Sequence, residues 1–600
     1  MSKMALHLLL WLILLPPFAE ASSEWEFNNV SRVVAMSDIH GAYDAMVETL
    51  QNADILDAAA SWVGGDAHLV IVGDVLDRGA DSRAAMDLLM RLEGEAAAAG
   101  GAVHVLIGNH EAMNLMGDLR YVSKEEYANF SDGETSQERE KWFQKYQAER
   151  SPPNGETAWS SFERKYPPGY FAQRRAFAAD GEYGKWLLSK PIVVVINGTA
   201  FVHGGLSPMI APLGLKGVNE TLHADLVNYV RGYDVLEQAG VLLPTDSERD
   251  RETRLAEFKA SPETPQDIVA TVAEMIRLGN SDLHAPDGPL WYRGNVYCQP
   301  LVESDRLQPS LDAIHADRVV IGHTPTSNRE VLSRLNGRVL EVDTGMLHKY
   351  YGGIGHALVL SGDSVRVISQ QSKESLSPEP QPRRVGERPD GMLSATELEA
   401  LLSSGTLGEP HKDETGREVL SVTDGTHTVQ AIFAQREAKG VYPDVAAYRL
   451  DRLLQLNMVP VAVIREVDGK SGSLQFLPDK SINEAERSKS GQGGGAYCPL
   501  TAQWPALYIF DSLIYNQGRT QQRMLYSPDT WQLLLVGHES AFGNKKGRPR
   551  HLANVDLDVN NAWHVALQSL DAATLEAKLG DVLDARRRRA LLDRRDALLK

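Results

Sequence analysis

Five short apolar runs in the first 330 residues each end in side chains that can bind metal ions or transfer protons. The motifs that follow these runs are Asp38-Ile39-His40-Gly41, Gly73-Asp74 with Asp77-Arg78-Gly79, Gly108-Asn109-His110-Glu111, His203-Gly204-Gly205 and Gly322-His323-Thr324. Carboxylate and imidazole groups are good ligands for Mn, Fe or Zn, and none of the motifs contains a thiolate. Two such ions can clamp a phosphate group and activate water. Together the motifs predict a site with two divalent ions that hydrolyses phosphate esters.

The apolar runs are the elements that must bring these motifs together. The predicted strands are Val33–Met36, Leu69–Val72, Val103–Ile107, Ile192–Ile196, Ala200–Val202 and Val319–Ile321. In α/β sheets, ligands collect at the carboxyl ends of the strands. Each motif alone would be a weak signal, because isolated histidines are more often packed or surface residues. Five motifs in the same position after five strands predict one shared pocket.

The alternation of strands and helices through residues 31–372 indicates an α/β (α+β) sandwich with a mixed sheet. Asn197-Gly198 is a tight-hairpin signal between two of the strands. A later hairpin is expected from Val339–Val342 and Ala357–Leu360. Inserts of more than about 15 residues often cover an active site. Two long polar helical inserts are expected here, at Lys124–Arg175 and His223–Leu283.

The motif set resembles the calcineurin-like metallophosphoesterases, and more narrowly their phosphoprotein phosphatase branch. Residues 108–126 and the stretch Pro289–Gly294 are similar to the Shewanella-like protein phosphatases. The resemblance covers about residues 31–370 and implies a metallophosphoesterase β-sandwich flanked by helices. Ser37 replaces a glycine that is usual in the branch, but this position is not a ligand. Pro325 stands where wider family members often have another histidine, and its presence fits the branch.

The resemblance also implies a role for each site residue. The metal ligands would be Asp38 and His40 for the first ion, Asp74 as the bridge, and Asn109, His203 and His323 for the second ion. His110 would be the general acid, oriented by Asp77. Arg78 and Arg293 would bind the substrate phosphate through guanidinium forks, which lysine could not reproduce.

Several of these positions have a second interpretation. Arg293 rests on the family match and would otherwise be a surface arginine. Tyr350 or Tyr351 could also reach the phosphate, although paired aromatic residues more often pack together. Asp343 follows an apolar strand and either supports a metal ligand by a hydrogen bond or only makes a turn.

The second half of the chain resembles atypical kinases related to secretory-pathway and phosphoinositide kinases, over residues 429–465 and 510–543. Active members carry a catalytic aspartate, an asparagine, a metal-binding aspartate and a nucleotide-binding lysine. The corresponding positions here hold Gly518, Arg523, Gly537 and Ala434. None of these residues can hold magnesium or position a nucleophile. The resemblance therefore implies a degenerate kinase-like α+β domain, a pseudokinase that serves as a scaffold or binds an unidentified partner.

The first residues carry a targeting signal. Lys3, the apolar run Ala5–Phe18 and the small residues Ala19 and Ala21 predict a signal peptide over residues 1–21. An uncleaved anchor or a buried helix is the alternative, but the run is short for a bilayer span. We expect an exported protein, periplasmic or secreted, without a stable transmembrane anchor. The expected order is a phosphatase domain over 22–372, a linker over 373–391 and the kinase-like domain over 392–600.

Charge and cysteine content exclude some classes of protein. The formal net charge of −19 argues against nucleic acid as a partner, because phosphate backbones need a basic surface. The two cysteines, Cys298 and Cys498, are too few for a disulfide framework or a thiolate zinc site. Whether these two cysteines pair with each other stays open.

Three functions remain under consideration. The first is hydrolysis of phosphate monoesters, on a phosphorylated protein or a small phosphoester. The second is hydrolysis of a nucleotide or dinucleoside polyphosphate, and the third is a non-catalytic module that binds phosphorylated or carbohydrate ligands. The complete metal-ligand set argues against the third function.

Overall fold

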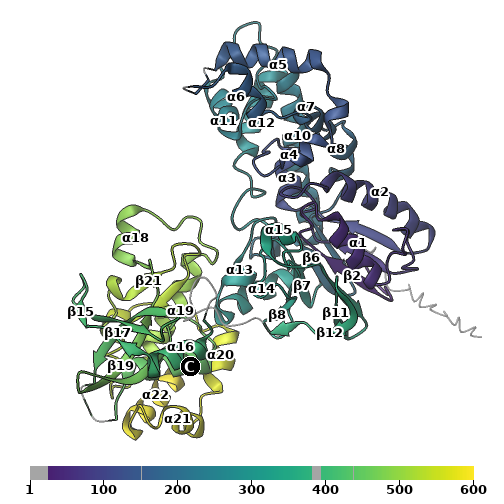
Figure 1. Ribbon diagram of the computed structural model, residues 1–600. Coiled ribbons are helices and arrows are strands. Elements are labelled where there is room, and N and C mark those ends of the chain that lie inside the picture. The colour runs from purple at the N-terminus through teal and green to yellow at the C-terminus, as the bar shows by residue number, and fades with distance from the viewer. Residues whose placement is uncertain (1–23, 151, 154, 381–392, 437, 439) are drawn as a thin grey trace, which may run out of the picture.

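The computed structural model describes residues 24–600 apart from 151, 154, 381–392, 437 and 439. The predicted signal peptide and most of the predicted linker therefore lie outside the described residues. Figure 1 shows a body with two sheets, a group of helices that projects from this body, and a C-terminal domain coloured green to yellow. Among the described residues, no helix has both the length and the apolar character that a bilayer span requires.

Two sheets form the body of the N-terminal region. In spatial order, the first sheet consists of β12 (Ser372–Leu376), β11 (Ser364–Ser369), β10 (His356–Ser361), β2 (Val33–Met36), β3 (His68–Ile71) and β4 (Ala102–Val105). The second consists of β1 (Glu26–Phe27), β5 (Val193–Ile196), β6 (Thr199–Val202), β7 (Arg318–Ile321), β9 (Val339–Glu341), β8 (Leu332–Arg334) and β13 (Glu379–Pro380). Both sheets contain parallel and antiparallel pairs, which confirms the predicted mixed α/β architecture.

Alternating side chains bury both faces of these strands, because successive residues of a strand point to opposite sides. Val33 and Ala35 of β2 pack into the apolar layer that also contains Val320 of β7. Val34 and Met36 face the other way and pack in a larger core with helices. The helices of this outer face include α1 (Tyr43–Asn52) and α2 (Ser82–Ala98). The two sheets thus form a sandwich that is flanked by helices.

The parallel strands place the five sequence motifs at one edge of the sandwich. β2, β3 and β4 are parallel neighbours, and β6 and β7 are parallel neighbours in the other sheet. The carboxyl ends of parallel strands meet at the same edge, so the loops that follow them converge. Helix α3 (Asn109–Leu115) begins within the motif that follows β4.

One of the two predicted hairpins is confirmed and the other is wrong. Asn197 and Gly198 join β5 to β6, and both residues have positive φ, 48° and 70°. Val339–Val342 and Ala357–Leu360 do not pair, because β9 lies between β7 and β8 while β10 lies between β11 and β2. The segment between them contains α15 (His348–Tyr351) and carries the chain from one sheet to the other.

The two inserts form the projecting group of helices in Figure 1. Their own small cores hold them together, one of which contains Tyr146, Phe162, Tyr166 and Phe171. The helices between β4 and β7 that lie in or beside the inserts are α4 (Lys124–Ala128), α5 (Ser136–Glu149), α6 (Ala158–Lys165), α7 (Tyr170–Ala176), α8 (Glu182–Leu187), α9 (Ile210–Gly217), α10 (His223–Gln238), α11 (Glu248–Glu257) and α12 (Gln266–Leu278).

The C-terminal domain combines an antiparallel sheet with helices. The sheet contains, in spatial order, β14 (Thr406–Leu407), β16 (Glu418–Thr423), β17 (Thr428–Gln435), β19 (Lys470–Leu477) and β18 (Ala462–Val467), and β15 (His411–Lys412) also pairs with β16. A second small sheet contains β20 (Ile482–Asn483), β21 (Met524–Tyr526) and β22 (Leu533–Leu535). The helices are α16 (Ala395–Ser404), α17 (Pro443–Leu454), α18 (Glu484–Ser490), α19 (Leu500–Ile514), α20 (Asn561–Gln568), α21 (Ala572–Leu579) and α22 (Ala585–Leu598).

The predicted linker, residues 373–391, begins inside the sandwich. Residues 372–376 form β12 on the edge of the first sheet, and residues 379–380 form β13 on the edge of the second. Strands can form here because each sheet has an edge strand with free hydrogen-bonding groups, which a polar segment can still pair with.

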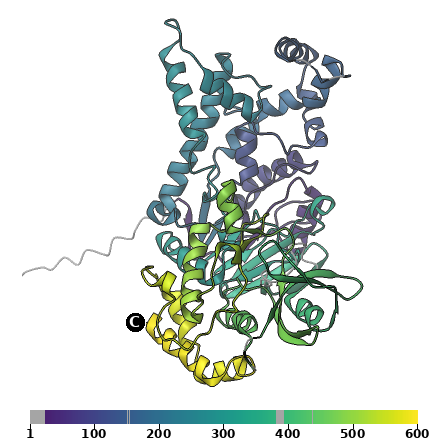
Figure 2. The same ribbon diagram turned by 90° about the vertical axis from the view of Figure 1, so that its left-hand side faces the viewer.

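The C-terminal domain packs against one side of the sandwich through α13 (Gly294–Tyr297) and α14 (Pro300–Ala313). In Figures 1 and 2, this domain lies next to the body on the side opposite to the tip of the helical group. Leu301 and Val302 of α14 belong to the apolar core of the C-terminal domain. Cys298 and Cys498 pair in a disulfide bond, which joins the two regions covalently.

Candidate metal centre

The structure brings all six predicted metal ligands to the carboxyl edge of the sandwich. Each lies within four residues of the carboxyl end of a strand: β2, β3, β4, β6 or β7. All six side chains are buried, with exposed fractions of 7% or less; they are Asp38, His40, Asp74, Asn109, His203 and His323. Neighbouring loops are joined by main-chain hydrogen bonds, from the Asp38 N–H to the Gly73 carbonyl (3.2 Å) and from the His40 N–H to the Asp74 carbonyl (3.0 Å).

The backbone of these loops adopts a conformation that residues other than glycine rarely take. Four of the predicted ligands have positive φ, between 48° and 66°: Asp38, His40, Asp74 and His323. Asp77 and Arg78 have φ of 73° and 68°. Residues held in such conformations cluster at functional sites, because the surrounding structure must compensate for the strain.

Asp74 lies at the centre of the cluster. Its Oδ2 atom is 3.2 Å from His203 Nε2 and 3.8 Å from Nε2 of both His40 and His110. Two groups of side chains could each hold a metal ion, and Asp74 belongs to both. One group adds His40 and His110 to Asp74, and the other adds His203 and His323. A shared carboxylate of this kind is what holds two metal ions close together in dinuclear sites.

Asn109 and Asp38 complete the two sides of the cluster. Asn109 Oδ1 is 2.9 Å from His203 Nε2, and Asp38 Oδ1 is 3.9 Å from His40 Nε2. The carboxylate of Asp38 also accepts a hydrogen bond from the His323 main-chain N–H (3.0 Å). Asp38 is thereby fixed between the motifs that follow β2 and β7.

The histidine rings are oriented so that one nitrogen of each points into the cluster. His40 Nδ1 is 2.7 Å from the Leu76 carbonyl, and His203 Nδ1 is 2.8 Å from the Val72 carbonyl. These contacts direct Nε2 of both rings towards Asp74, as hydrogen bonds behind metal-binding histidines usually do. Nε2 of His323 is buried and has no hydrogen-bond partner among the described residues, although buried polar atoms are normally paired.

Buried negative charge is concentrated in this cluster. Burial raises the pKa of Asp38 well above its usual range, and the neighbouring Asp343 and Asp74 raise it further. Burial also raises the pKa of Asp343 to about 6 and that of Glu111 to about 7. Burying carboxylates is costly unless a cation compensates their charge. The donor types, the unpaired His323 nitrogen and this charge therefore fit divalent metal ions such as Mn, Fe or Zn.

Comparison with known proteins agrees with this geometry. Residues 31–327 match the family model of the calcineurin-like phosphoesterases. We refer to this matching region, which is just under half of the chain, as the phosphoesterase domain.

Individual proteins and a solved structure are also similar to this chain. Shewanella-like protein phosphatase 2 of Arabidopsis thaliana is 35% identical over 201 residues, which are 32% of this chain and 51% of the relative, so the match spans about half the length of that protein. Shewanella-like protein phosphatase 1 of Plasmodium berghei is 24% identical over 334 residues, 54% of this chain and 71% of the relative. The crystal structure of a cold-active protein-tyrosine phosphatase from a psychrophilic Shewanella aligns with 59% of this chain and 83% of its own, at 24% identity and a TM-score of 0.36.

The predicted general acid of the phosphoesterase domain lies beside the metal ligands. His110 Nδ1 is 2.5 Å from Asp77 Oδ2, and both side chains are buried. Burial lowers the pKa of His110, but the carboxylates of Asp74 and Asp77 outweigh this effect and raise it above its usual value. A raised pKa keeps the proton on the imidazole ring up to a higher pH, which suits a general acid.

Sequence reasoning assigned no role to two residues that support this arrangement. Asn114 donates a hydrogen bond from Nδ2 to Asp77 Oδ1 (2.9 Å), so it fixes the carboxylate behind His110. The carboxylate of Glu111 accepts hydrogen bonds from the main-chain N–H groups of Asp74 and Val75 (2.8 Å each). Glu111 was visible in its motif, whereas Asn114 shows its role only when one turn of α3 places it next to Asp77.

The two predicted phosphate-binding arginines lie on different sides of the cluster. Arg78 Nη1 is 2.6 Å from His40 Nε2, and Arg78 also donates a hydrogen bond to the Tyr351 hydroxyl group. Arg293 Nη1 donates to Thr324 Oγ1 (2.8 Å) and to the His323 carbonyl (3.3 Å). Both guanidinium groups therefore contact metal-ligand motifs, and neither is an ordinary surface arginine.

The tyrosines and Asp343 can also be placed. The ring of Tyr350 lies 5.5 Å from Arg78 Cζ and is 62% exposed, so it borders the site from the solvent side. Tyr351, which bonds Arg78, is the more deeply placed of the two. Asp343 accepts a hydrogen bond from the Gly345 N–H (3.0 Å), which corresponds to the turn interpretation. Its buried charge still acts on Asp38, as the pKa of Asp38 shows.

Proposed function

We propose that this chain is a metal-dependent hydrolase of phosphate monoesters with a centre of two divalent ions. The observation that carries the proposal is the position of Asp74, whose carboxylate lies between His40 and His110 on one side and His203 and His323 on the other, so that each side could hold an ion. We assign His110 to proton transfer, and Asp38, which lies beside His40, takes its place as a ligand. The residues that would hold the ions are Asp38, His40, Asp74, Asn109, His203 and His323.

The residues around this centre supply the remaining steps of the reaction. Bound ions would polarise the phosphate and supply an activated water for attack on phosphorus. Arg78 and Arg293 hold the phosphate oxygens from two sides by charge-assisted hydrogen bonds. His110 donates its Nε2 proton to the departing alkoxide or phenoxide oxygen, and Asp77 stabilises the imidazolium form before that transfer.

A phosphorylated protein is the substrate class that we propose. The similarity to protein phosphatases supports it, and so does the shape of the surface next to Arg78. A groove of about 740 Å³ adjoins the site, and its lining includes Asp44, Arg78, Lys349 and Tyr350. A groove that runs past the phosphate-binding arginine can accept a peptide on either side of a phosphorylated residue.

The experiment that tests this function combines metal analysis with a substrate panel on the protein without residues 1–21. We expect about two Mn, Fe or Zn ions per chain and turnover of phosphotyrosine or phosphoserine peptides that stops when the ions are removed. Mononucleotides and dinucleoside polyphosphates serve as the competing substrates. Faster turnover of the nucleotides would replace the protein-phosphatase assignment by a nucleotide hydrolase. No turnover of any phosphoester by the metal-loaded protein would leave only a binding function.

We further propose that the C-terminal domain is a pseudokinase. Arg523 supports this, because its guanidinium group fills the space between the positions where a kinase would carry carboxylates. Arg523 Nη1 donates to the carbonyl groups of Gly518 (3.1 Å) and Gly537 (3.4 Å), and Arg523 also pairs with Glu539. A Cβ atom added at Gly537 would lie 3.0 Å from Arg523 Cδ. A side chain at that position, such as a metal-binding aspartate, would therefore require the arginine to shift.

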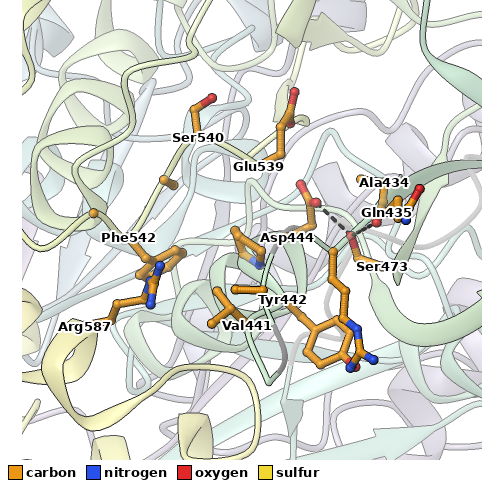
Figure 3. Close-up of a pocket in the computed structure, with 15 residues that line it drawn as sticks. Ala434, Gln435, Val441, Tyr442, Asp444, Ser473, Glu539, Ser540, Phe542 and Arg587 are labelled. Atoms are coloured by element: carbon orange, nitrogen blue, oxygen red, sulfur yellow. Dashed lines mark hydrogen bonds between the residues drawn. The ribbon is translucent and has the colours of Figure 1, made fainter. Parts of the chain in front are cut away.

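A neighbouring cavity, which shares Glu539 with this group, supports the pseudokinase proposal. It has a volume of about 190 Å³ and is lined by Ala434 of β17 and by Asp444, Ser473 and Glu539, among others (Figure 3). Asp444 is occupied by structural contacts, since it accepts hydrogen bonds from Ser473 Oγ (2.8 Å) and from the His538 N–H (2.7 Å). In the Asp74→Asn background, where the phosphoesterase site is disabled, we expect no transfer of the γ-phosphate of ATP to the chain or to a general protein substrate in the presence of Mg²⁺. Such a transfer would contradict the pseudokinase proposal.

Export from the cytoplasm is proposed from the predicted signal peptide together with the disulfide bond. Disulfide bonds persist in oxidising compartments and are rare in the cytosol. Counting free thiols in protein isolated from the native host tests this: none is expected under denaturing conditions without reductant. Two free thiols would argue for a reducing compartment.

A further inference from the structure

The disulfide bond between the two regions lies next to the phosphoesterase site. Cys298 follows α13 directly, only five residues after Arg293. Cys498 precedes α19 of the C-terminal domain and follows Tyr497. The bond therefore brings Tyr497, a residue 200 positions away from Tyr297 in the chain, to the border of the site.

Tyr497 contacts the phosphate-binding arginine itself. Its ring centroid lies 5.0 Å from Arg293 Cζ, which is the arrangement of a cation–π contact. The same ring packs against Tyr297 with 4.8 Å between centroids. The Tyr497 N–H donates to the Thr530 carbonyl (3.1 Å), so the ring is held by its own domain as well.

Arg293 thus has contacts in both the phosphoesterase domain and the C-terminal domain. Its Nη1 atom is bound to Thr324 and to the carbonyl of the predicted ligand His323, while the C-terminal domain supplies the ring against its guanidinium plane. An arginine side chain has many rotamers, and contacts on both sides reduce the number that it samples before phosphate binds. A phosphate ligand then meets an arginine that is already in position.

The chain that carries Tyr497 would not hold this position alone. The preceding segment, 491–495, contains four glycines, which give a chain its greatest conformational freedom. The disulfide bond and the Thr530 contact follow immediately and restrict Tyr497. The disulfide bond therefore lies directly after a glycine-rich segment and next to the residue that contacts Arg293.

We propose that Tyr497 is a positioning residue for Arg293, and that the Cys298–Cys498 bond holds Tyr497 against it. The C-terminal domain would then complete the phosphate-binding site of the phosphoesterase domain. This inference rests on the proposed function, because it assigns Arg293 to phosphate binding.

The test is a comparison of Tyr497→Ala with Tyr497→Phe in the full chain loaded with Mn²⁺. Two quantities are measured: the KM for 4-nitrophenyl phosphate, and the Kd of inorganic phosphate by calorimetry. We expect Tyr497→Ala to raise both by roughly three- to tenfold with a smaller change in kcat, as the loss of one partly buried cation–π contact predicts. Tyr497→Phe keeps the ring and should restore both values to within about twofold of the wild type.

Two further variants separate positioning from general loosening of the domain interface. Tyr508→Ala removes a partly buried tyrosine of α19 that is not a contact of Arg293, and it should leave the Kd of phosphate unchanged. In the Arg293→Ala background, Tyr497→Ala should have no additional effect, because the residue it positions is gone. Cys498→Ser should raise the Kd of phosphate in the same direction as Tyr497→Ala.

The outcomes decide between the two proposals. Unchanged phosphate Kd in Tyr497→Ala, or an equal loss in the wild-type and Arg293→Ala backgrounds, overturns the positioning role. The metal-loaded wild type could bind phosphate and yet hydrolyse no phosphoester, and this result would contradict the hydrolase function. The role of Tyr497 would still be tested in that case, because the Kd of phosphate can be compared between the variants without turnover.

Discussion

The two halves of this chain each contain a cleft, but only one of the two clefts is lined by the residues that phosphate chemistry needs. In the phosphoesterase domain, strand ends deliver Asp38, Asp74 and His203 to one buried cluster. In the C-terminal domain, the positions that our proposal aligns with kinase catalytic residues also lie together, and they hold Gly537 and Arg523, which contact each other. The arrangement of the backbone is therefore a weaker indicator of activity than the charges of the side chains in the cleft.

The difference in charge balance shows how the two clefts depend on cations. The first cleft buries several carboxylates, and burial, together with neighbouring carboxylates, raises the pKa values of Asp38, Asp343 and Glu111. In the second cleft, Arg523 pairs with Glu539 and Asp444 is satisfied by Ser473 and His538. A cleft with unbalanced buried charge calls for a cation, whereas a cleft that is internally paired does not.

The largest expected effect comes from removing the shared carboxylate. Asp74→Asn should lower kcat/KM for phosphate monoesters by about 10³- to 10⁴-fold, since metal ions contribute several kcal/mol to such reactions. Metal content, measured by elemental analysis, should fall in parallel. Asp444→Asn is the matched change of a buried aspartate in the other cleft, and we expect it to leave kcat/KM unchanged. Equal losses in both variants would mean that the comparison between the clefts is wrong.

Replacement of the general acid should have a somewhat smaller effect that depends on the leaving group. His110→Asn should reduce kcat for an alkyl phosphate roughly 10²- to 10³-fold, because the alkoxide then leaves without a proton. For 4-nitrophenyl phosphate, whose leaving group needs no proton, the reduction should be much smaller. Steady-state rates on the two substrates with the same enzyme preparation measure this difference. An identical reduction for both substrates would exclude His110 as the proton donor.

The part of this site that could be predicted from sequence is the part encoded locally. An apolar run followed by a ligand motif gives both the strand and the position of the ligand at its end, so Asp38, Asn109 and His323 could be placed in one pocket. The family resemblance added Arg293. Contacts that depend on how separate elements pack could not be predicted from the sequence. For example, no local pattern identifies Asn114 as the partner of Asp77.

Long-range pairing set the limits of the fold prediction as well. The strands at Val339 and Ala357 were recognised, but their pairing was wrong, since apolar periodicity indicates a strand and not its neighbour. Residues 372–380 look like the start of a linker by composition and nevertheless extend both sheets. The contact between Arg293 and Tyr497 likewise exists only because the two domains pack together.

A third variant tests Asp77, the residue that orients the general acid His110. Asp77→Asn should lower kcat by about 10- to 100-fold, as is usual for residues that orient a catalytic group. The Asp77 carboxylate is one of the groups that raise the pKa of His110. His110 acts in its protonated form, so activity falls as pH rises through this pKa, and removing the carboxylate should move the alkaline limb of the kcat profile to lower pH. A profile that keeps its alkaline limb would assign that limb to another group.

The smallest expected effect concerns the degenerate cleft and tests whether Arg523 occupies the place of a lost carboxylate. Gly537→Ala and Gly469→Ala both introduce a side chain at positive φ, 72° and 74°, which costs about 1–2 kcal/mol of unfolding free energy. A Cβ atom at Gly469 would meet nothing within 4 Å, whereas one at Gly537 would lie 3.0 Å from Arg523 Cδ. Denaturant unfolding should therefore show an additional loss of about 1 kcal/mol for Gly537→Ala.

Combining Gly537→Ala with Arg523→Ala separates the steric contribution from the backbone contribution. If the arginine fills the space beside Gly537, its removal should abolish the additional loss, so that the two substitutions are non-additive by about 1 kcal/mol, as expected for residues in contact. Equal stabilities of Gly537→Ala and Gly469→Ala would instead mean that Arg523 moves aside freely. In that case Arg523 would not prevent a carboxylate at position 537 from binding a metal ion. The difference between the two clefts would then be due only to the absence of carboxylates at Gly518 and Gly537.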